Sequence, residues 1–205
     1  MRISIWGDRL ERWFAIIGHR APSSGELNLN DLAGSGGRMD VLARAVNSAL
    51  FVSHGVRRDS HVLLHLMGGD GPSRRIWFDG STLGGVRPDE RSIAGQIRGV
   101  LKNPIPPRSH FKEFSRGILH SGGGIEQTID EWAGRGICPV MLDAGGGDFS
   151  AVPTSVDLGF IISDDKPFTE LETETLHEAV PLSLGDTWLQ GHSCIAILHH
   201  LLDGN

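Results

Sequence analysis

The chain has 205 residues, enough for one large domain or two small ones. A hydrophobic content of 39% supports a buried core. The net charge of -6 and the pI near 5.9 give no global attraction to nucleic acid, so any RNA surface must be a local patch. With only two cysteines, Cys138 and Cys194, a disulfide framework is not expected and a reducing cytoplasm fits. Apolar runs stay below the roughly 20 residues of a membrane span, and the charged N-terminus is unlike a signal peptide.

Apolar runs alternate with amphipathic segments along the chain. Residues 1–11 have no clear period, and we interpret them as an N-terminal arm. Strands are predicted at residues 13–17, 61–66, 76–78 (with the character of an edge strand), 137–142, 158–162 and 179–182. Helices are predicted at residues 39–52, 87–101, 125–132, 170–177 and 194–203, and residues 111–121 form a strand or a loop.

Each predicted strand is a continuous apolar run without polar alternation, and helices separate the strands. This pattern is typical of a mainly parallel, buried sheet in an α/β fold. Ligands of such sheets collect at the carboxyl ends of the strands. Here those ends carry Leu142 and Asp143 after one strand and Ser163 after the next.

A glycine-rich segment, residues 34–37, precedes Arg38 and the first predicted helix. Its position favours a phosphate-binding loop, but it lacks the Lys-Ser/Thr ending and the dinucleotide spacing of such loops. The alternative is a glycine turn that sets the entry to the helix.

The loop before the second strand carries His54, Arg57, Arg58 and Asp59. Adjacent arginines can clamp a phosphate, because guanidinium groups bind phosphate oxygens bidentately. The alternative is a solvated charge cluster. Two histidines follow at 61 and 65 without an obvious third ligand, so no metal site is predicted.

The C-terminal segment, residues 181–203, combines a glycine-containing loop with an amphipathic helix. Gly191 and Ser193 lie where that helix begins, and a helix start offers unpaired N–H groups to a ligand. Alone, this pattern is equally typical of a buried helix that closes a domain.

Several blocks of the chain resemble the SPOUT-superfamily tRNA (pseudouridine-54 N1)-methyltransferases of archaea. The blocks are the loop 184–189, the string His192-x-Cys194-Ile195 with the helix end at 198–203, the Asp-Leu-x-Gly-Ser segment 31–38, and the string Ser-His-x-x-Arg-Arg-Asp at 53–59. The resemblance covers residues 13–203. It implies one SPOUT methyltransferase domain over residues 12–205, preceded by the arm 1–11.

The resemblance implies a mainly parallel sheet flanked by helices, a deep C-terminal trefoil knot and a homodimer. It implies transfer of a methyl group from S-adenosylmethionine to N1 of a pseudouridine at T-loop position 54 of tRNA. Asp59 is then the candidate base, with His54 as the alternative, and Arg38, Arg57 and Arg58 bind RNA. The residues expected to bind the cofactor are Leu142, Ser163, Leu184, Gly185, Asp186, Thr187, Trp188, Leu189 and Cys194.

Two other functions stay open. One is an enzyme of the same family that acts on another RNA, such as ribosomal RNA. The other is a knotted protein that binds RNA or S-adenosylmethionine without catalysis. The chain departs from the family pattern at Ser163, where relatives tend to have Gly, and at Gly185-Asp186, where they have Ser-Pro.

Overall fold

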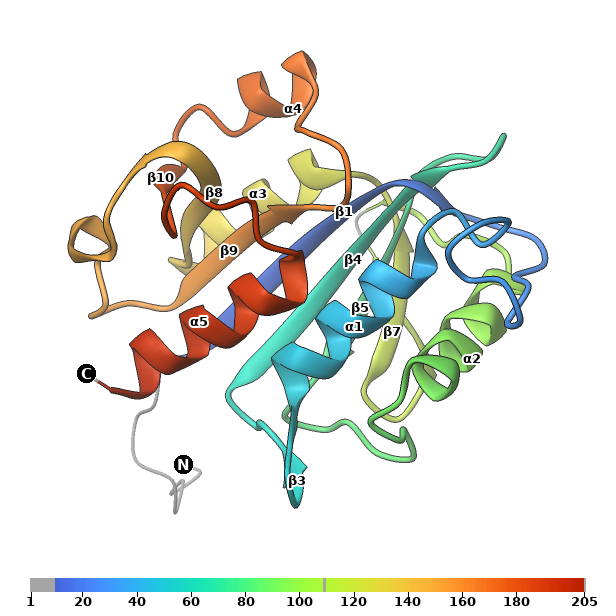
Figure 1. Cartoon of the computed structure of the whole chain (residues 1–205). Helices are drawn as coiled ribbons and strands as arrows, with labels where there is room; N and C mark the ends of the chain where they lie inside the picture. Colours follow the sequence, from blue (N-terminus) through green and yellow to red (C-terminus); the bar gives the residue numbers. More distant parts are fainter. Residues whose placement is uncertain (1–9, 109, 205) are drawn as a thin grey trace.

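The computed structural model describes residues 10–108 and 110–204, and one eight-stranded sheet runs through them (Figure 1). The strand order is β10-β8-β9-β1-β4-β5-β7-β6. These strands are β1 (Arg12–Pro22), β4 (Ser60–Gly68), β5 (Arg74–Asp79), β6 (Lys112–Ser115), β7 (Ile118–Gly122), β8 (Cys138–Gly147), β9 (Leu158–Ser163) and β10 (Val180–Leu182). A separate hairpin pairs β2 (Phe51–Val52) with β3 (Gly55–Val56).

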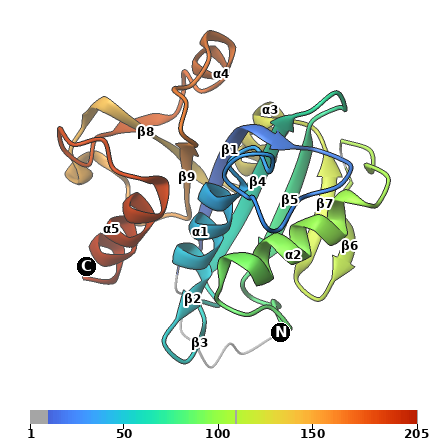
Figure 2. The same cartoon turned by 45° about the vertical axis from the view of Figure 1, so that its right-hand side comes forward.

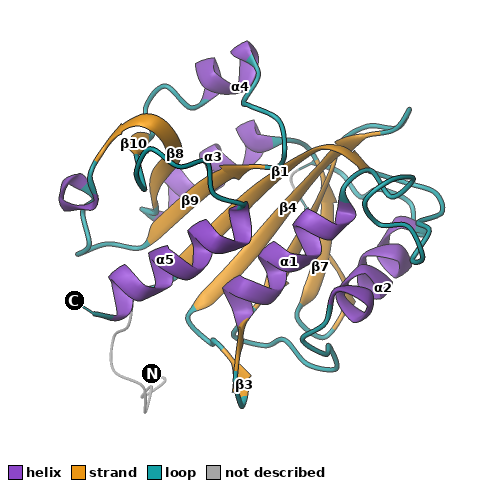
Figure 3. Ribbon diagram, viewed as in Figure 1, coloured by secondary structure: helices purple, strands orange, loops and turns teal. Residues whose placement is uncertain are grey.

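The helices are α1 (Met39–Leu50), α2 (Glu90–Leu101), α3 (Ile125–Arg135), α4 (Glu170–Thr175) and α5 (Gly191–Asp203), with a short 3-10 helix at Phe149–Ala151. Buried side chains of α1, α2 and α5 share one core with Phe14 and Ile16 of β1. Residues of α3 and the end of α4 share a second core with Trp13, Ala15 and Ile17. Successive side chains of β1 therefore point to opposite faces of the sheet, and a layer of helices covers each face (Figure 3).

β1 is central and pairs in parallel with both β4 and β9, while β8 and β10 extend the parallel part. The predicted mainly parallel α/β sheet is therefore confirmed. The expectation that residues 76–78 form an edge strand was wrong, because β5 pairs antiparallel with β4 on one side and with β7 on the other. Residues 111–121, predicted as a strand or a loop, form the hairpin β6–β7, and β6 is the edge strand.

The parallel half is packed closely enough to require a glycine. A Cβ atom on Gly159 of β9 would lie 2.3 Å from the indole ring of Trp132, so α3 can approach the sheet only because that side chain is missing. Across the described ranges, no helix is both long and apolar enough to cross a membrane. Most of the predicted arm, residues 1–9, lies outside the described residues, and the trefoil knot stays a prediction.

Candidate functional site

A pocket of about 340 Å³ opens where β8, β9 and β10 end and α5 begins. Parallel strands bring their carboxyl ends to one edge of the sheet, and the loops that follow them form the walls. Eight of the nine residues predicted to bind the cofactor line this pocket: Leu142, Ser163, Leu184, Gly185, Thr187, Trp188, Leu189 and Cys194. The ninth, Asp186, is exposed on the same loop and does not line it.

Much of the pocket wall is apolar. Leu142 lies within β8, one residue past the last one that pairs with β9, while Ile162 lies near the end of β9 and Leu184 comes from the loop after β10. The predicted strand end at Asp143 was wrong, because β8 continues to Gly147. Cys194 of α5 faces the same space, and burial raises the pKa of its thiol. The thiol is therefore a neutral packing group at physiological pH, not a nucleophile.

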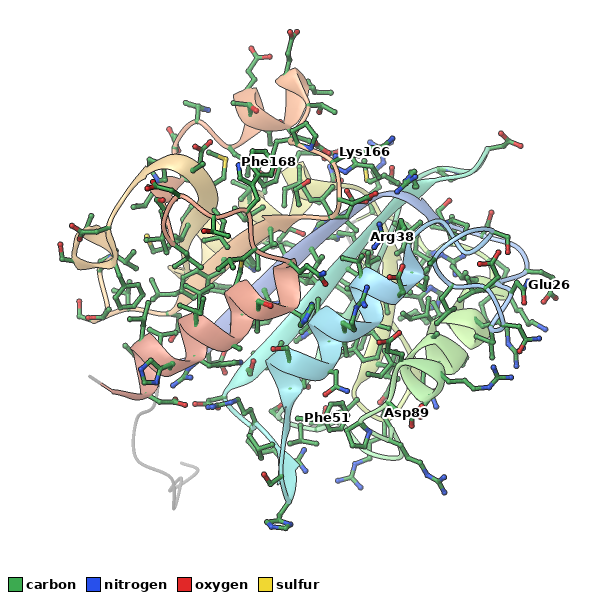
Figure 4. The ribbon with its side chains drawn as sticks, in the orientation of Figure 1. Glu26, Arg38, Phe51, Asp89, Lys166 and Phe168 are labelled. Atoms are coloured by element: carbon green, nitrogen blue, oxygen red, sulfur yellow. The ribbon has the colours of Figure 1, made fainter. Side chains whose placement is uncertain are left out.

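The segment between β9 and α4 forms a wall that the sequence did not predict. Its pocket residues are Asp164, Lys166, Pro167 and Phe168, and Thr173 of α4 adds to them. Figure 4 labels Lys166 and Phe168 on this segment. The sequence did signal a strand end at residues 163–165, but an exposed loop has no periodicity that tells which of its side chains turn inward.

The start of α5 borders the pocket through Gly191. A Cβ atom at that position would lie 3.3 Å from Ile162, so the helix begins directly against the end of β9. Ser193, which the sequence also placed at this helix start, donates its N–H to the carbonyl of Gln190 at 2.8 Å. Of the two positions, only Gly191 therefore borders the cavity.

Arg38 lies at the same edge of the sheet, at the N-terminus of α1 (Figure 4). Its backbone is left-handed, with φ 65°, and its guanidinium binds Asp40 at 3.0 Å and Asp165 at 3.3 Å. Asp165 follows Asp164 of the pocket wall, so Arg38 ties α1 to that wall. The glycine segment before it serves as a turn here, because a Cβ atom on Gly37 would lie 2.1 Å from the carbonyl oxygen of Arg20.

The other residues predicted to bind RNA or to act in catalysis lie at the opposite end of the central strands, just before β4 begins. Arg57 binds Asp203 with nitrogen–oxygen distances of 3.2 and 2.6 Å, and Arg58 donates to the carbonyls of Gly80, Ser81 and Leu83. Asp59 lies 3.9 Å from Arg12. His54 is exposed at the turn between β2 and β3. β3 lies at the bottom of Figure 1.

α5 separates these residues from the pocket. Gly191 at its start lines the cavity and Asp203 at its end binds Arg57. The helix has 13 residues, so at a rise of about 1.5 Å per residue its ends lie roughly 20 Å apart. The structure therefore does not bring Asp59 or His54 to the pocket of the same chain, and their catalytic roles stay predictions, as does cofactor binding by the residues that line the pocket.

A family model described as "Putative SAM-dependent RNA methyltransferase" matches residues 11–205. The chain belongs to this family. Two archaeal relatives are named tRNA (pseudouridine(54)-N(1))-methyltransferase. The protein of Haloarcula marismortui is 39% identical over 195 residues, which cover 94% of this chain and 96% of the relative. The protein of Methanospirillum hungatei is 37% identical over 190 residues, with 92% and 94% covered. The family predicted from the sequence blocks is thereby confirmed.

A solved structure supports the fold independently. The crystal structure of Archaeoglobus fulgidus Nep1 bound to S-adenosylhomocysteine matches with a TM-score of 0.61, covering 95% of this chain and 98% of that one. At 14% sequence identity this likeness concerns the fold alone. The SPOUT fold class predicted from the sequence is confirmed at this level.

Proposed function

We propose that this protein methylates N1 of the pseudouridine at position 54 of tRNA, with S-adenosylmethionine as the methyl donor. The proposal rests on two relatives that bear this activity in their names and are 37% and 39% identical to this chain over nearly its full length. The pocket at the strand ends adds a physical argument, since it gathers the predicted cofactor residues in one place. A tRNA substrate and the absence of a membrane-spanning helix among the described residues fit a cytoplasmic enzyme.

The chemistry of the pocket fits S-adenosylmethionine. Apolar side chains such as Leu142, Leu184 and Leu189 suit the faces of an adenine ring. Asp143, within β8, adds a carboxylate that accepts the N–H of Gly145 at 2.6 Å, and negative charge suits a cationic ligand. When bound, S-adenosylmethionine supplies a methyl group on a positively charged sulfur.

Methylation of pseudouridine forms an N1–C bond while the bond between methyl carbon and sulfur breaks, and the N1 proton must leave. A carboxylate or a neutral imidazole can accept that proton, and Asp59 or His54 is our candidate. Since both lie at the far end of α5, we infer that the acceptor comes from a second copy of the chain. Arg57 and Arg58 of that copy would lie beside the RNA strand.

We therefore propose a homodimer. Trp188 is 84% exposed and Leu189 37% exposed, although both also line the pocket. Ala196 and Ile197 on α5 leave further apolar surface accessible. An exposed apolar rim beside a binding pocket suits a covering partner, and a second copy supplies one by two-fold symmetry.

The test uses purified protein and S-adenosylmethionine labelled in its methyl group. One tRNA transcript carries pseudouridine at position 54 and a matched transcript carries uridine there. The proposal expects one labelled N1-methylpseudouridine at position 54 in the first transcript only, located by nuclease digestion and mass spectrometry. Ribosomal RNA is incubated in parallel, and label there but not in tRNA would favour the same chemistry on another RNA. Cofactor binding without transfer to either RNA would favour a non-catalytic binding protein.

A further inference from the structure

His19, at the end of β1, lies between two carboxylates. Its Nδ1 is 2.8 Å from Oδ1 of Asp164, and its Nε2 is 3.0 Å from Oε2 of Glu172 in α4. Its backbone N–H also donates to Oδ2 of Asp164 at 2.8 Å. The side chains are well buried, with exposed fractions of 10% for His19, 0% for Asp164 and 8% for Glu172.

This arrangement fixes the protonation state of the ring. A carboxylate only accepts hydrogen bonds, and a neutral imidazole has a single N–H, so a neutral His19 would leave one ring nitrogen facing an oxygen without a proton. Burial alone lowers the pKa of His19, but the hydrogen bonds to Asp164 and Glu172 outweigh it and raise that pKa above its ordinary value. The geometry therefore requires an imidazolium that donates to both carboxylates.

The two carboxylates are the anchors of the pocket wall. Asp164 accepts the N–H of Lys166 at 3.0 Å, and its own N–H donates to the carbonyl of Ile17. Glu172 accepts the N–H of Thr169 at 2.8 Å and so closes the first turn of α4. The segment between these anchors carries Lys166 and Phe168 into the pocket.

The other charged groups that face this segment are already paired with each other. Arg20 of β1 and Arg38 at the start of α1 both bind Asp165, and Arg38 also binds Asp40. His19 thus links β1 to Asp164, the residue after β9, and to Glu172 of α4. Figure 2 shows α4 above β9.

We propose that His19 is a positioning residue for cofactor binding: its doubly protonated ring holds the 164–172 wall against the pocket, and loss of one proton releases α4. The inference rests on the proposed cofactor site. Because the folded state raises the pKa of His19, the stabilisation is complete below the unfolded value near 6.5 and is lost as pH rises through the folded value. Affinity for the cofactor should therefore weaken toward alkaline pH.

The test measures the dissociation constant of S-adenosylhomocysteine by calorimetry between pH 5.5 and 8.5. The unaltered protein should bind more weakly as pH rises, by at most about tenfold per pH unit for one linked proton. Glu172→Gln is the matched variant, because an amide satisfies a neutral imidazole. The affinity of Glu172→Gln for S-adenosylhomocysteine should depend little on whether His19 is protonated. His19→Gln should bind S-adenosylhomocysteine weakly at every pH. The ligand's own amino group titrates equally in all three, so it cancels in the comparison.

The outcomes separate this inference from the proposed function. Binding with identical pH profiles in the unaltered protein and Glu172→Gln would overturn the role of His19 alone. No binding at any pH by the unaltered protein would overturn the cofactor site and the inference together. If the variants fail to fold, an NMR titration of ¹³C-labelled histidines in the unaltered protein decides the matter. A His19 pKa below about 6.5 would contradict the imidazolium.

Discussion

The two ends of α5 lie in opposite kinds of surroundings. At its start, Gly191 and Cys194 border a hollow with an apolar rim, and Trp188 on that rim is 84% exposed. At its end, Asp203 lies in a dense group of charges. Arg12 binds Asp203 at 2.7 Å and His199 at 3.0 Å, while Arg57 binds the other oxygen of Asp203.

Residue type alone therefore does not identify a binding site. Polar side chains at the end of α5 pair with one another: Arg12 donates to His199 at 3.0 Å, and His199 donates to the carbonyl of Ala49 at 3.0 Å. The pocket at the start of α5 instead has apolar side chains left open to solvent. One end therefore offers binding surface, and the other offers ion pairs that stabilise the fold, with the proposed base Asp59 beside Arg12.

The largest expected effect concerns Asp59. Asp59→Asn keeps the shape but removes the negative charge, so RNA should bind nearly as well while the single-turnover rate of methyl transfer falls by about 10²–10⁴-fold. Asp130→Asn, at an exposed carboxylate of α3 that does not line the pocket, is the control. A normal rate for Asp59→Asn at saturating RNA would leave Asp59 as a counter-ion of Arg12 and make His54 the next residue to test.

The pocket end is tested by Leu184→Glu, which puts a carboxylate into an apolar wall. Affinity for S-adenosylmethionine should fall by at least about 100-fold, because burying an unpaired charge costs several kcal/mol. Leu171→Glu is the control, since Leu171 is 72% exposed on α4. Calorimetry with equal affinities for both variants would place the cofactor elsewhere.

The ion-pair end is tested by Arg12→Met. Removing the guanidinium leaves His199 and Asp59 without it in a largely buried setting, so unfolding by urea should become easier by about 3 kcal/mol. Arg87→Met, on an exposed loop, should change stability little. Cofactor affinity of folded Arg12→Met should stay near normal; a loss of affinity with full stability would contradict the division between the two ends.

The smallest expected effects are on RNA affinity, at the two arginines predicted to bind RNA at opposite ends of the molecule. Arg38→Ala at the pocket edge and Arg57→Ala at the far end should each weaken RNA binding several-fold and reduce the salt slope by about 1 if two copies share one RNA site. Binding measured at several salt concentrations decides this. A change for Arg38→Ala alone would confine the RNA to one end of each chain.

Asp203 gives the ion-pair end a pH signature. Although burial opposes the shift, hydrogen bonds from Arg57 and Arg12 lower the pKa of Asp203 to about 2. Since the folded pKa is depressed, this stabilisation is present above the usual value near 4 and is lost as pH falls toward 2. Arg12→Met should therefore reduce the acid sensitivity of unfolding in that window.

Local patterns predicted much of this molecule. The solid apolar runs predicted the parallel half of the sheet, and the loop 184–189 was recognised because its residues are contiguous in the sequence. The β5 edge assignment failed because the preceding glycine turn says nothing of the partner on the far side, β7, which begins at Ile118.

Long-range partners were beyond the sequence. His19 and Asp164 are separated by 145 positions, and Arg57 and Asp203 by 146. No spacing rule connects such pairs. The sequence therefore suggested Arg57 as a phosphate ligand and gave no indication of a role for His19. Parallel pairing of β1 with β9 brings His19 beside Asp164.

We propose that the pocket of one chain works with Asp59 of a second copy. The direct test mixes two inactive variants, Leu184→Glu and Asp59→Asn, under conditions that exchange subunits. Each mixed dimer would hold one site with an intact pocket and an intact Asp59, so an equal mixture should recover about a quarter of the unaltered methyl-transfer activity. An inactive mixture, with mixed dimers demonstrated by native mass spectrometry, would contradict the account.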